Sequence, residues 1–146
     1  MKLNFENFKK TVEKEYVINL ATSAENKVTL RSVGPIIIDQ TIYFYTGNND
    51  EKYRQMKANN NVAFSIGING KYYGQGKAKF LGSIFDDKNH HLREIYKKKY
   101  EGAFEISAPG EDMNSNEFIG IHIMLLKEWI FDAEKGIPLE LVEEKF

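Results

Sequence analysis

Residues 41–65 read TIYFYTGNNDEKYRQMKANNNVAFS. The first six of them are β-branched or aromatic, a composition typical of a strand. A polar turn follows, and then a short helix over residues 50–58 that carries Lys52, Arg54 and Lys57. Because the start of a helix presents unpaired N–H groups and a partial positive charge, cations beside it favour an anion site.

Arg31 lies upstream of this stretch in VTLRSVGPIII, residues 28–38, a second predicted strand. If this strand pairs with residues 41–46, the guanidinium of Arg31 converges on the same anion. We therefore predict a phosphate site formed by Arg31 and Lys52, with Thr46 and Arg54 nearby.

The cations of the short helix also have an interpretation that needs no ligand. Lys52, Arg54 and Lys57 can form the solvent-exposed face of an amphipathic helix whose Tyr53 and Met56 face inward. Spacing alone does not choose between the two interpretations.

Bulk composition narrows the function classes. The 146 residues fit one domain over residues 1–146, and 13% aromatic content favours a β-rich globule. A net charge of −1 disfavours nucleic acid and anionic membranes as partners. Without cysteine, disulfides, iron–sulfur clusters and a thiol nucleophile are excluded, so redox chemistry would need a bound cofactor. The longest apolar run, residues 119–126, is too short to cross a bilayer, and no signal peptide is evident, so we predict a cytoplasmic protein.

The flanking segments predict a small barrel. Phe5, Phe8 and Val12 behind Asn4 indicate an amphipathic first helix, and residues 86–100 indicate a later one. Six strands are expected, at residues 16–23, 28–38, 41–46, 62–68, 71–81 and 118–131. Turn residues separate them, with Asn69-Gly70 as the clearest hairpin signal, a bulge or bend expected at Gly34-Pro35, and Gly74 and Gly76 marking a tight bend in the fifth strand. The expected fold is mainly β with short helices, an α+β protein built on a six-stranded closed or split barrel.

The histidines do not form a recognisable metal site. His90 and His91 are adjacent on a predicted helix, so their side chains point about 100° apart and cannot bind one metal from that element. His122 lies in an apolar strand, where a hydrogen-bonded core or interface histidine is the alternative to a catalytic one. The chain has no nucleophile elbow, Walker loop or G-x-G-x-x-G motif. We therefore predict no metal and assign no catalytic residue.

The order of these motifs resembles a known family. Its marks are INLATSAENKVTLRSVGPIIIDQTIYFYTGNNDEKYRQMKANNNVAFSI followed by YYGQGKAKFLG, within a resemblance that spans about residues 5–131. This pattern resembles the flavin-binding split-barrel superfamily of pyridoxamine 5′-phosphate oxidase-like proteins. A nearer subgroup is the nitroimidazole-reductase-like proteins, which share the short architecture.

The resemblance implies a flavin site that holds FMN. Arg31 and Lys52 would hold the FMN phosphate, with the hydroxyl of Thr46 as a further donor. The backbone of Ser32, Val33 and Gly34 would border the flavin ring, and Lys71 would approach it from the fifth strand. Because the family binds flavin across a homodimer interface, residues near Trp129 would come from the partner chain.

The chain also departs from the family pattern. Asp50 stands where many relatives have Ser, and as a helix N-cap its carboxylate would partly repel a phosphate. Asn60 stands where many relatives have Pro. The C-terminal Arg-x-His substrate motif of true pyridoxamine 5′-phosphate oxidases is missing, so vitamin B6 oxidase activity is not expected.

The resulting hypothesis is an FMN-dependent oxidoreductase that passes electrons from a nicotinamide or other reductant to a small organic molecule. Its rivals are a flavin or haem binding module without turnover and a structural or ligand-sensing barrel. A homodimer is expected because residues 119–131 are apolar on both faces, more than one half-buried strand needs. The long segment 102–116, with Pro109-Gly110, is interpreted either as a lid over the site or as a plain connector.

Overall fold

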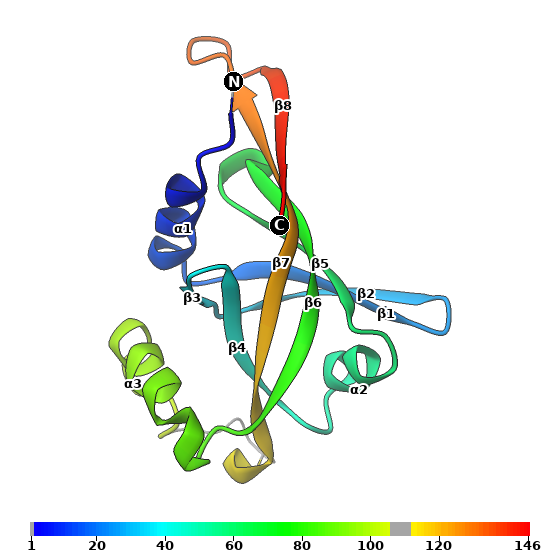
Figure 1. The fold of residues 1–146 in the computed structure, drawn as a ribbon, viewed down its shortest axis with the longest axis vertical. Helices are drawn as coiled ribbons and strands as arrows, with labels where there is room; N and C mark the ends of the chain where they lie inside the picture. The colour runs from blue at the N-terminus through cyan, green and yellow to red at the C-terminus, as the bar shows by residue number, and fades with distance from the viewer. Residues whose placement is uncertain (1, 106–111) are drawn as a thin grey trace.

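The structure, a computed structural model, describes residues 2–105 and 112–146. In these residues one antiparallel sheet contains eight strands in the order β2-β1-β5-β6-β7-β4-β3, with β8 paired to β7 (Figure 1). The elements are α1 (Phe5–Lys14), β1 (Ile18–Ala24), β2 (Lys27–Val33), β3 (Ile36–Ile38), β4 (Thr41–Gly47), α2 (Glu51–Ala58), β5 (Asn61–Ile66), η1 (Ile68–Gly70), β6 (Tyr72–Ser83), η2 (Asp87–Asn89), α3 (His90–Lys99), η3 (Met113–Ser115), β7 (Asn116–Phe131) and β8 (Pro138–Lys145). The prediction of a mainly β fold with short helices is confirmed.

The long strand β7 organises the sheet. Along one edge it pairs with β6, and along the other it pairs first with β4 and then with β8. Figure 1 shows α1 and α3 on one side of β7 and α2 on the other, while the β1–β2 hairpin crosses β6 and β7. The sheet is therefore divided into two parts that share β6 and β7.

The sheet curls because its two edge strands follow each other in the chain. Strand β2 ends at Val33 and β3 begins at Ile36, so only Gly34-Pro35 connects the edges. Proline has no backbone N–H and cannot extend the ladder. The expected second strand is thus two strands. Together with β8, which lies mostly exposed and shows little burial pattern, this break explains why eight strands are seen where six were expected.

Helix α3 holds this seam with side chains that bind backbone carbonyls. Tyr96 donates its hydroxyl to the carbonyl of Gly34 at 2.6 Å, and Tyr100 donates to that of Pro35 at 2.9 Å. Lys99 donates to the same Pro35 carbonyl and to that of Val12, both at 2.6 Å. Carbonyls that the broken ladder leaves unpaired are thereby satisfied.

The main core lies inside the curled sheet, beneath α1. Phe8 and Val12 of α1 are fully buried against core residues such as Phe64 and Tyr72, and Phe8 contacts Tyr72 edge-on at 5.3 Å between ring centroids. The expected cap is confirmed, because the side chain of Asn4 accepts from the N–H of Asn7. A second cluster around Tyr96 packs beneath α3.

The glycines of β6 allow two backbones to approach closely. A Cβ on Gly76 would lie 2.6 Å from the carbonyl oxygen of His122, and one on Gly74 would lie 2.4 Å from that of Leu125. The expected bend is present as a register shift between Gln75 and Gly76. The hairpin at Asn69-Gly70 is also confirmed, since both residues have positive φ and strands β5 and β6 pair across them.

This register shift explains why β7 is apolar on both faces. Ile121 and Ile123 are buried, then Met124 is exposed, and Leu126 is buried again on the other parity. A bulge that inserts one residue moves the following side chains to the opposite face. Residues of both apolar sets, Ile121, Ile123 and Leu126, therefore lie in this chain's own core, whereas Met124 stays exposed. The homodimer prediction thus needs more than the apolar pattern of β7 as its basis.

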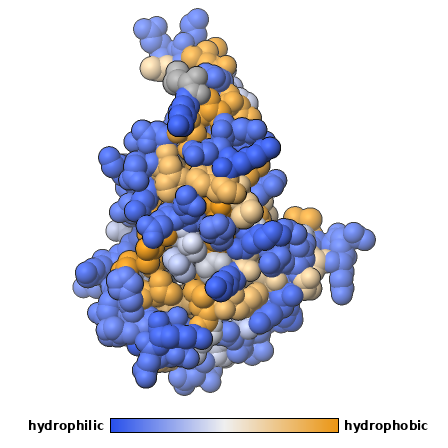
Figure 2. Space-filling view, in the orientation of Figure 1, coloured by the Kyte–Doolittle hydropathy of each residue, from blue (hydrophilic) through white to orange (hydrophobic). Residues whose placement is uncertain are grey.

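The face of the molecule that Figure 2 shows is predominantly hydrophilic. Figure 2 shows charged and polar side chains over most of one face, with hydrophobic side chains exposed along its middle. None of the helices in the described part of the chain is long and apolar enough to span a membrane.

Candidate functional site

The structure brings Arg31 and Lys52 to the same open hollow. The hollow has a volume of about 560 Å³, and its lining also includes Thr29, Leu30, Asp50 and Glu51. The route differs from the expected one, because β2, which carries Arg31, pairs only with β1. Of the expected strand 28–38, only the short β3 pairs with β4. The two cations meet because α2 packs against β1.

Arg31 is held by the β1–β2 hairpin. Its guanidinium donates to the carbonyl of Leu20 at 3.0 Å and to the hydroxyl of Thr22 at 2.8 Å, and it also donates to the hydroxyl of Thr29. Partial burial lowers the pKa of Arg31, and the nearby charge of Glu51 opposes that effect. An arginine stays charged under these conditions, so the hairpin presents a fixed cation.

A buried glutamine connects this hairpin to α2. Gln55 accepts from the hydroxyl of Thr22 at 2.5 Å and from that of Thr29 at 2.6 Å, and it is almost fully buried. Each threonine hydroxyl thus donates to Gln55 and accepts from Arg31. Because Gln55 and Lys52 lie on one short helix, this network sets the position of Lys52 relative to Arg31.

Sequence reasoning did not identify the Thr22–Thr29–Gln55 network. A signal was present in β1, where Ile18 and Leu20 share the inward face with Thr22. Thr22 is directly opposite Thr29 in the β1–β2 register. A polar pair at a buried position needs a hydrogen-bonding partner, and the partner comes from a helix 33 residues away in sequence.

Asp50 occupies the donors that were expected to bind phosphate. One oxygen of its carboxylate accepts from the hydroxyl of Thr46 at 2.8 Å, from the N–H of Gly47 at 3.2 Å and from the ammonium of Lys52 at 3.3 Å. Partial burial opposes the charged form, but these hydrogen bonds and the charge of Lys52 together hold the pKa of Asp50 below its usual value. Asp50 is at the N-cap position, yet its side chain makes no capping hydrogen bond, contrary to expectation.

The other cations of α2 lie outside the hollow. Arg54 is exposed and donates to the carbonyl of Asn49, and the ammonium of Lys57 lies 4.0 Å from the ring centroid of Phe80. For these two residues the solvent-exposed face was the right interpretation. The side chain of Lys52, by contrast, is only 19% exposed.

Lys71 and Trp129 lie together, away from the hollow. The N–H of Trp129 donates to the carbonyl of Lys71 at 2.8 Å, and the ammonium of Lys71 donates to the carbonyl of Trp129 at 3.2 Å. Lys71 also pairs with the buried Glu128 at 3.2 Å. In the strand order of the sheet, β1, β5 and β6 lie between β2, which carries Arg31, and β7, which carries Trp129. Within one chain, therefore, these two residues do not join Arg31.

The predicted ring-bordering residues point in different directions. Ser32 is exposed and donates its hydroxyl to the side chain of Asn19 at 3.2 Å, while Val33 is buried in the core. Gly34 lies under α3, where an added Cβ would be 3.0 Å from the hydroxyl oxygen of Tyr96. Of these three residues, only Ser32 is exposed.

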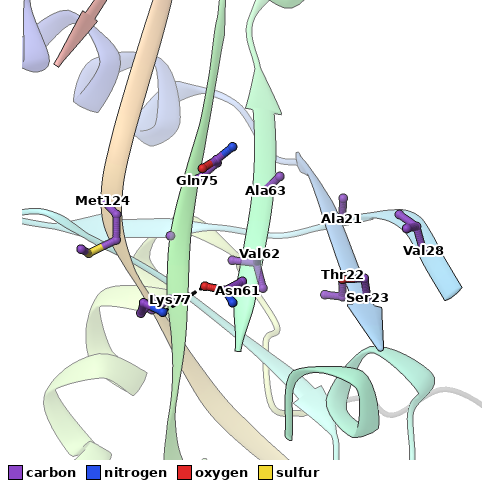
Figure 3. Close-up of a pocket in the computed structure, with 11 residues that line it drawn as sticks. Ala21, Thr22, Ser23, Val28, Asn61, Val62, Ala63, Gln75, Lys77 and Met124 are labelled. Carbon is purple, nitrogen blue, oxygen red and sulfur yellow. Dashed lines mark hydrogen bonds between the residues drawn. The ribbon is translucent and has the colours of Figure 1, made fainter. Parts of the chain in front are cut away.

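A second hollow of about 420 Å³ lies on the outer face of the sheet (Figure 3). Its lining includes the small side chains of Ala21 and Ala63 together with Val28 and Met124. The one charged lining residue is Lys77, whose ammonium donates to the side chain of Asn61 at 3.0 Å. Such a mainly apolar and small-residue lining is suited to a contact surface.

The remaining expectations concern the histidines, a metal site and the segment 102–116. His90, His91 and His122 are all exposed, so His122 is not a core histidine. No cluster of potential metal ligands occurs in residues 2–105 and 112–146. Of the segment 102–116, residues 106–111 lie outside the described residues, and these include Pro109-Gly110.

Comparison with known proteins identifies the architecture. No family model and no curated protein matches the chain. Among solved structures, a protein from Listeria innocua assigned as a pyridoxamine 5′-phosphate oxidase has a TM-score of 0.64 at 18% identity over 83% of this chain and 94% of its own. An FAD-binding protein from Mesorhizobium loti has a TM-score of 0.63 at 18% identity over 85% and 92%. The haem storage protein HutZ from Vibrio cholerae has a TM-score of 0.66 at 10% identity over 84% and 91%.

At these identities the comparison establishes the fold and leaves the ligand open. The TM-scores show that the chain shares its overall fold with all three. The split-barrel prediction is confirmed, and the chain has the fold of pyridoxamine 5′-phosphate oxidase-like proteins.

Proposed function

We propose that the protein binds a flavin through its phosphate, with FMN as the preferred form, and acts as an oxidoreductase on a small organic molecule. The observation that carries the proposal is the convergence of Arg31 and Lys52 on one open hollow, each fixed by its own element. The FAD-binding neighbour from Mesorhizobium loti supports a flavin on this fold.

The donors around the hollow fit a phosphate in type and number. A guanidinium, an ammonium, a hydroxyl and a backbone N–H are contributed by Arg31, Lys52, Thr46 and Gly47. Charge-assisted hydrogen bonds from such groups are the usual means of binding phosphate in proteins. Three of the four donors contact Asp50, so the fit requires its carboxylate to move.

A bound flavin would supply the electron-transfer chemistry, and the chain's own residues would hold and orient it. Arg31 and Lys52 would fix the phosphate end, while the exposed side of residues 32–34 would lie next to the ring. The proposed electron donor is a nicotinamide nucleotide, and the proposed electron acceptor is a small organic molecule. Vitamin B6 oxidation is not part of the proposal.

We further propose that a second copy of the chain covers the outer face of the sheet. Val28 and Leu30 of β2 are each 71% exposed there, and Met124 is 38% exposed beside the small side chains of Ala21 and Ala63. Apolar residues gathered on one face of a soluble protein are typical of an interface. A partner on this face would also supply contacts, such as those of Trp129, that one chain cannot bring to its own Arg31.

A second candidate is a haem-binding or flavin-binding module without turnover, which the fold of HutZ supports. The exposed histidines weaken the haem version, because none of the described ones lines the hollow. The absorption spectrum of the purified protein separates the candidates: a flavin spectrum, a Soret band, or neither.

The decisive test is to bind FMN and riboflavin to Lys52→Ala, with Lys57→Ala as the matched control. Loss of one charge-assisted contact of about 1.5–3 kcal/mol should weaken FMN by roughly 10- to 100-fold. Riboflavin, which has no phosphate, should be nearly unaffected, and Lys57→Ala should change neither. Equal weakening of both ligands, or of neither, would contradict the assignment. Turnover is then tested by anaerobic bleaching with NADH or NADPH and reoxidation by a nitro-aromatic or a quinone over many cycles.

A further inference from the structure

The contacts of Asp50 are unusual for a residue at the start of a helix. An N-cap carboxylate normally accepts from the N–H groups of the first helical turn. The side chain of Asp50 instead turns back to the end of β4, where one oxygen accepts from Thr46 and Gly47 as well as from Lys52 of α2. A hydroxyl, a backbone N–H and an ammonium on one anionic oxygen are the kind of contacts a phosphate oxygen would make.

The charged side chains that line the hollow balance one another. Arg31 and Lys52 are opposed by Asp50 and Glu51, and all four line the hollow. Glu51 already has a partner outside this group, because Lys27 contacts its carboxylate at 2.8 Å. Asp50 is therefore the carboxylate that neutralises Lys52.

Asp50 can leave this position without unfolding the helix. Its side chain is 45% exposed, and it makes none of the capping contacts that hold the first turn of α2. Rotation of the side chain toward solvent would free the hydroxyl of Thr46, the N–H of Gly47 and the ammonium of Lys52 together. The buried Gln55 network would keep α2 and Arg31 in place during this movement.

We propose that Asp50 is an internal occupant of the anion site, and that its carboxylate must be displaced before a phosphate group can bind. This inference rests on the proposed function of the same hollow. Displacement lowers the affinity for every phosphate-bearing ligand by the interactions that Asp50 loses. A free phosphate ion has only those contacts to offset the loss, whereas FMN also has the contacts of its ring. The same cost therefore leaves a free phosphate ion too weakly bound to occupy the site, whereas FMN, with the contacts of its ring, still binds.

The test compares the wild-type chain with Asp50→Ser and Asp50→Asn, using FMN, riboflavin and inorganic phosphate as probes. The matched control is Glu51→Gln, which removes the same charge from the same hollow but none of the three donor contacts. Affinities for the flavins are measured by fluorescence quenching, and phosphate binding by calorimetry at fixed ionic strength. Circular dichroism establishes that each variant is folded.

We expect Asp50→Ser to bind FMN about 10- to 100-fold more tightly than the wild type, the effect of one or two charge-assisted hydrogen bonds. Asp50→Asn should show a smaller gain, because its amide oxygen still accepts. Riboflavin affinity should stay within about twofold for all variants, and Glu51→Gln should gain less than about threefold. Inorganic phosphate should bind to Asp50→Ser and not measurably to the wild type.

Two results would overturn the inference while leaving the flavin proposal intact: equal FMN affinity in Asp50→Ser and the wild type, or an equal gain in Glu51→Gln. If no variant binds FMN, the flavin proposal fails, and inorganic phosphate decides the role of Asp50. Phosphate binding by Asp50→Ser alone then supports an internal occupant of an anion site for another ligand. No phosphate binding by any variant then overturns both. If Asp50→Ser does not fold, the same comparisons are made with Asp50→Asn.

Discussion

The buried amide of Gln55 offers the sharpest test of how this site is built. Substitution of Gln55 by Leu keeps the approximate volume but removes the oxygen that accepts from Thr22 and Thr29. Both hydroxyls lie in a part-buried to buried setting, and each also accepts from Arg31. In the variant, the two hydroxyl protons would lose the Gln55 oxygen as their acceptor, and water could replace it only in part.

The magnitude follows from the number of hydrogen bonds. Each buried donor left without an acceptor costs about 1–3 kcal/mol, and the added apolar side chain recovers part of this. We expect Gln55→Leu to lower the free energy of unfolding by about 2–3 kcal/mol, which corresponds to a fall in Tm of roughly 5–10 °C for a chain of this length. Because the network also positions Arg31, FMN affinity should fall by about tenfold and riboflavin affinity should not.

Urea denaturation followed by circular dichroism measures the first effect, and FMN titration of the folded variant measures the second. Gln40→Leu is the control, because Gln40 lies exposed in the turn before β4 and its side chain takes no part in this network. If the two variants differ in stability by less than about 0.5 kcal/mol, Gln55 does not connect α2 to the hairpin in the way described.

Three further predictions test the fold and its surfaces. Gly76→Ala should fail to fold or lose at least about 3 kcal/mol of unfolding free energy, because its Cβ would lie 2.6 Å from a backbone oxygen. In Gly70→Ala the added Cβ would meet no atom within 4 Å, so thermal unfolding should show only the smaller strain of its positive φ. Burial lowers the pKa of Lys99 to about 8 from 10.5, so the unfolded chain binds more protons between these values, and stability should rise with pH from about 8 to 10 and lose that rise in Lys99→Met. Burial raises the pKa of Tyr96 above 10.0, so stability should fall again at higher pH, as urea titrations across the series would show. Leu30→Glu should convert the expected homodimer to a monomer in sedimentation experiments without loss of secondary structure, and a dimer that survives it would place the interface elsewhere.

Local sequence determined most of the individual elements. The strand at residues 41–46, the Asn69-Gly70 turn, the cap at Asn4 and the bend at Gly76 were all predicted and are present. Each depends on interactions within a few residues: side-chain shape against the backbone, a capping hydrogen bond, or freedom at positive φ. Such signals are readable because the sequence contains both partners close together.

The tertiary structure alone decided how these elements meet. The sequence placed Arg31 and Lys52 at one site on the premise that their strands pair, whereas they meet because Gln55 ties α2 to the β1–β2 hairpin. Likewise, a bulge beside Gly76 lets Ile123 and Leu126, which are on opposite parities of β7, both lie in the core of one chain. These outcomes depend on which strands become neighbours, and on which donor reaches which acceptor after the sheet has curled. Contacts between residues distant in sequence leave no periodic pattern, so they cannot be predicted from the local sequence and become visible only in the folded chain.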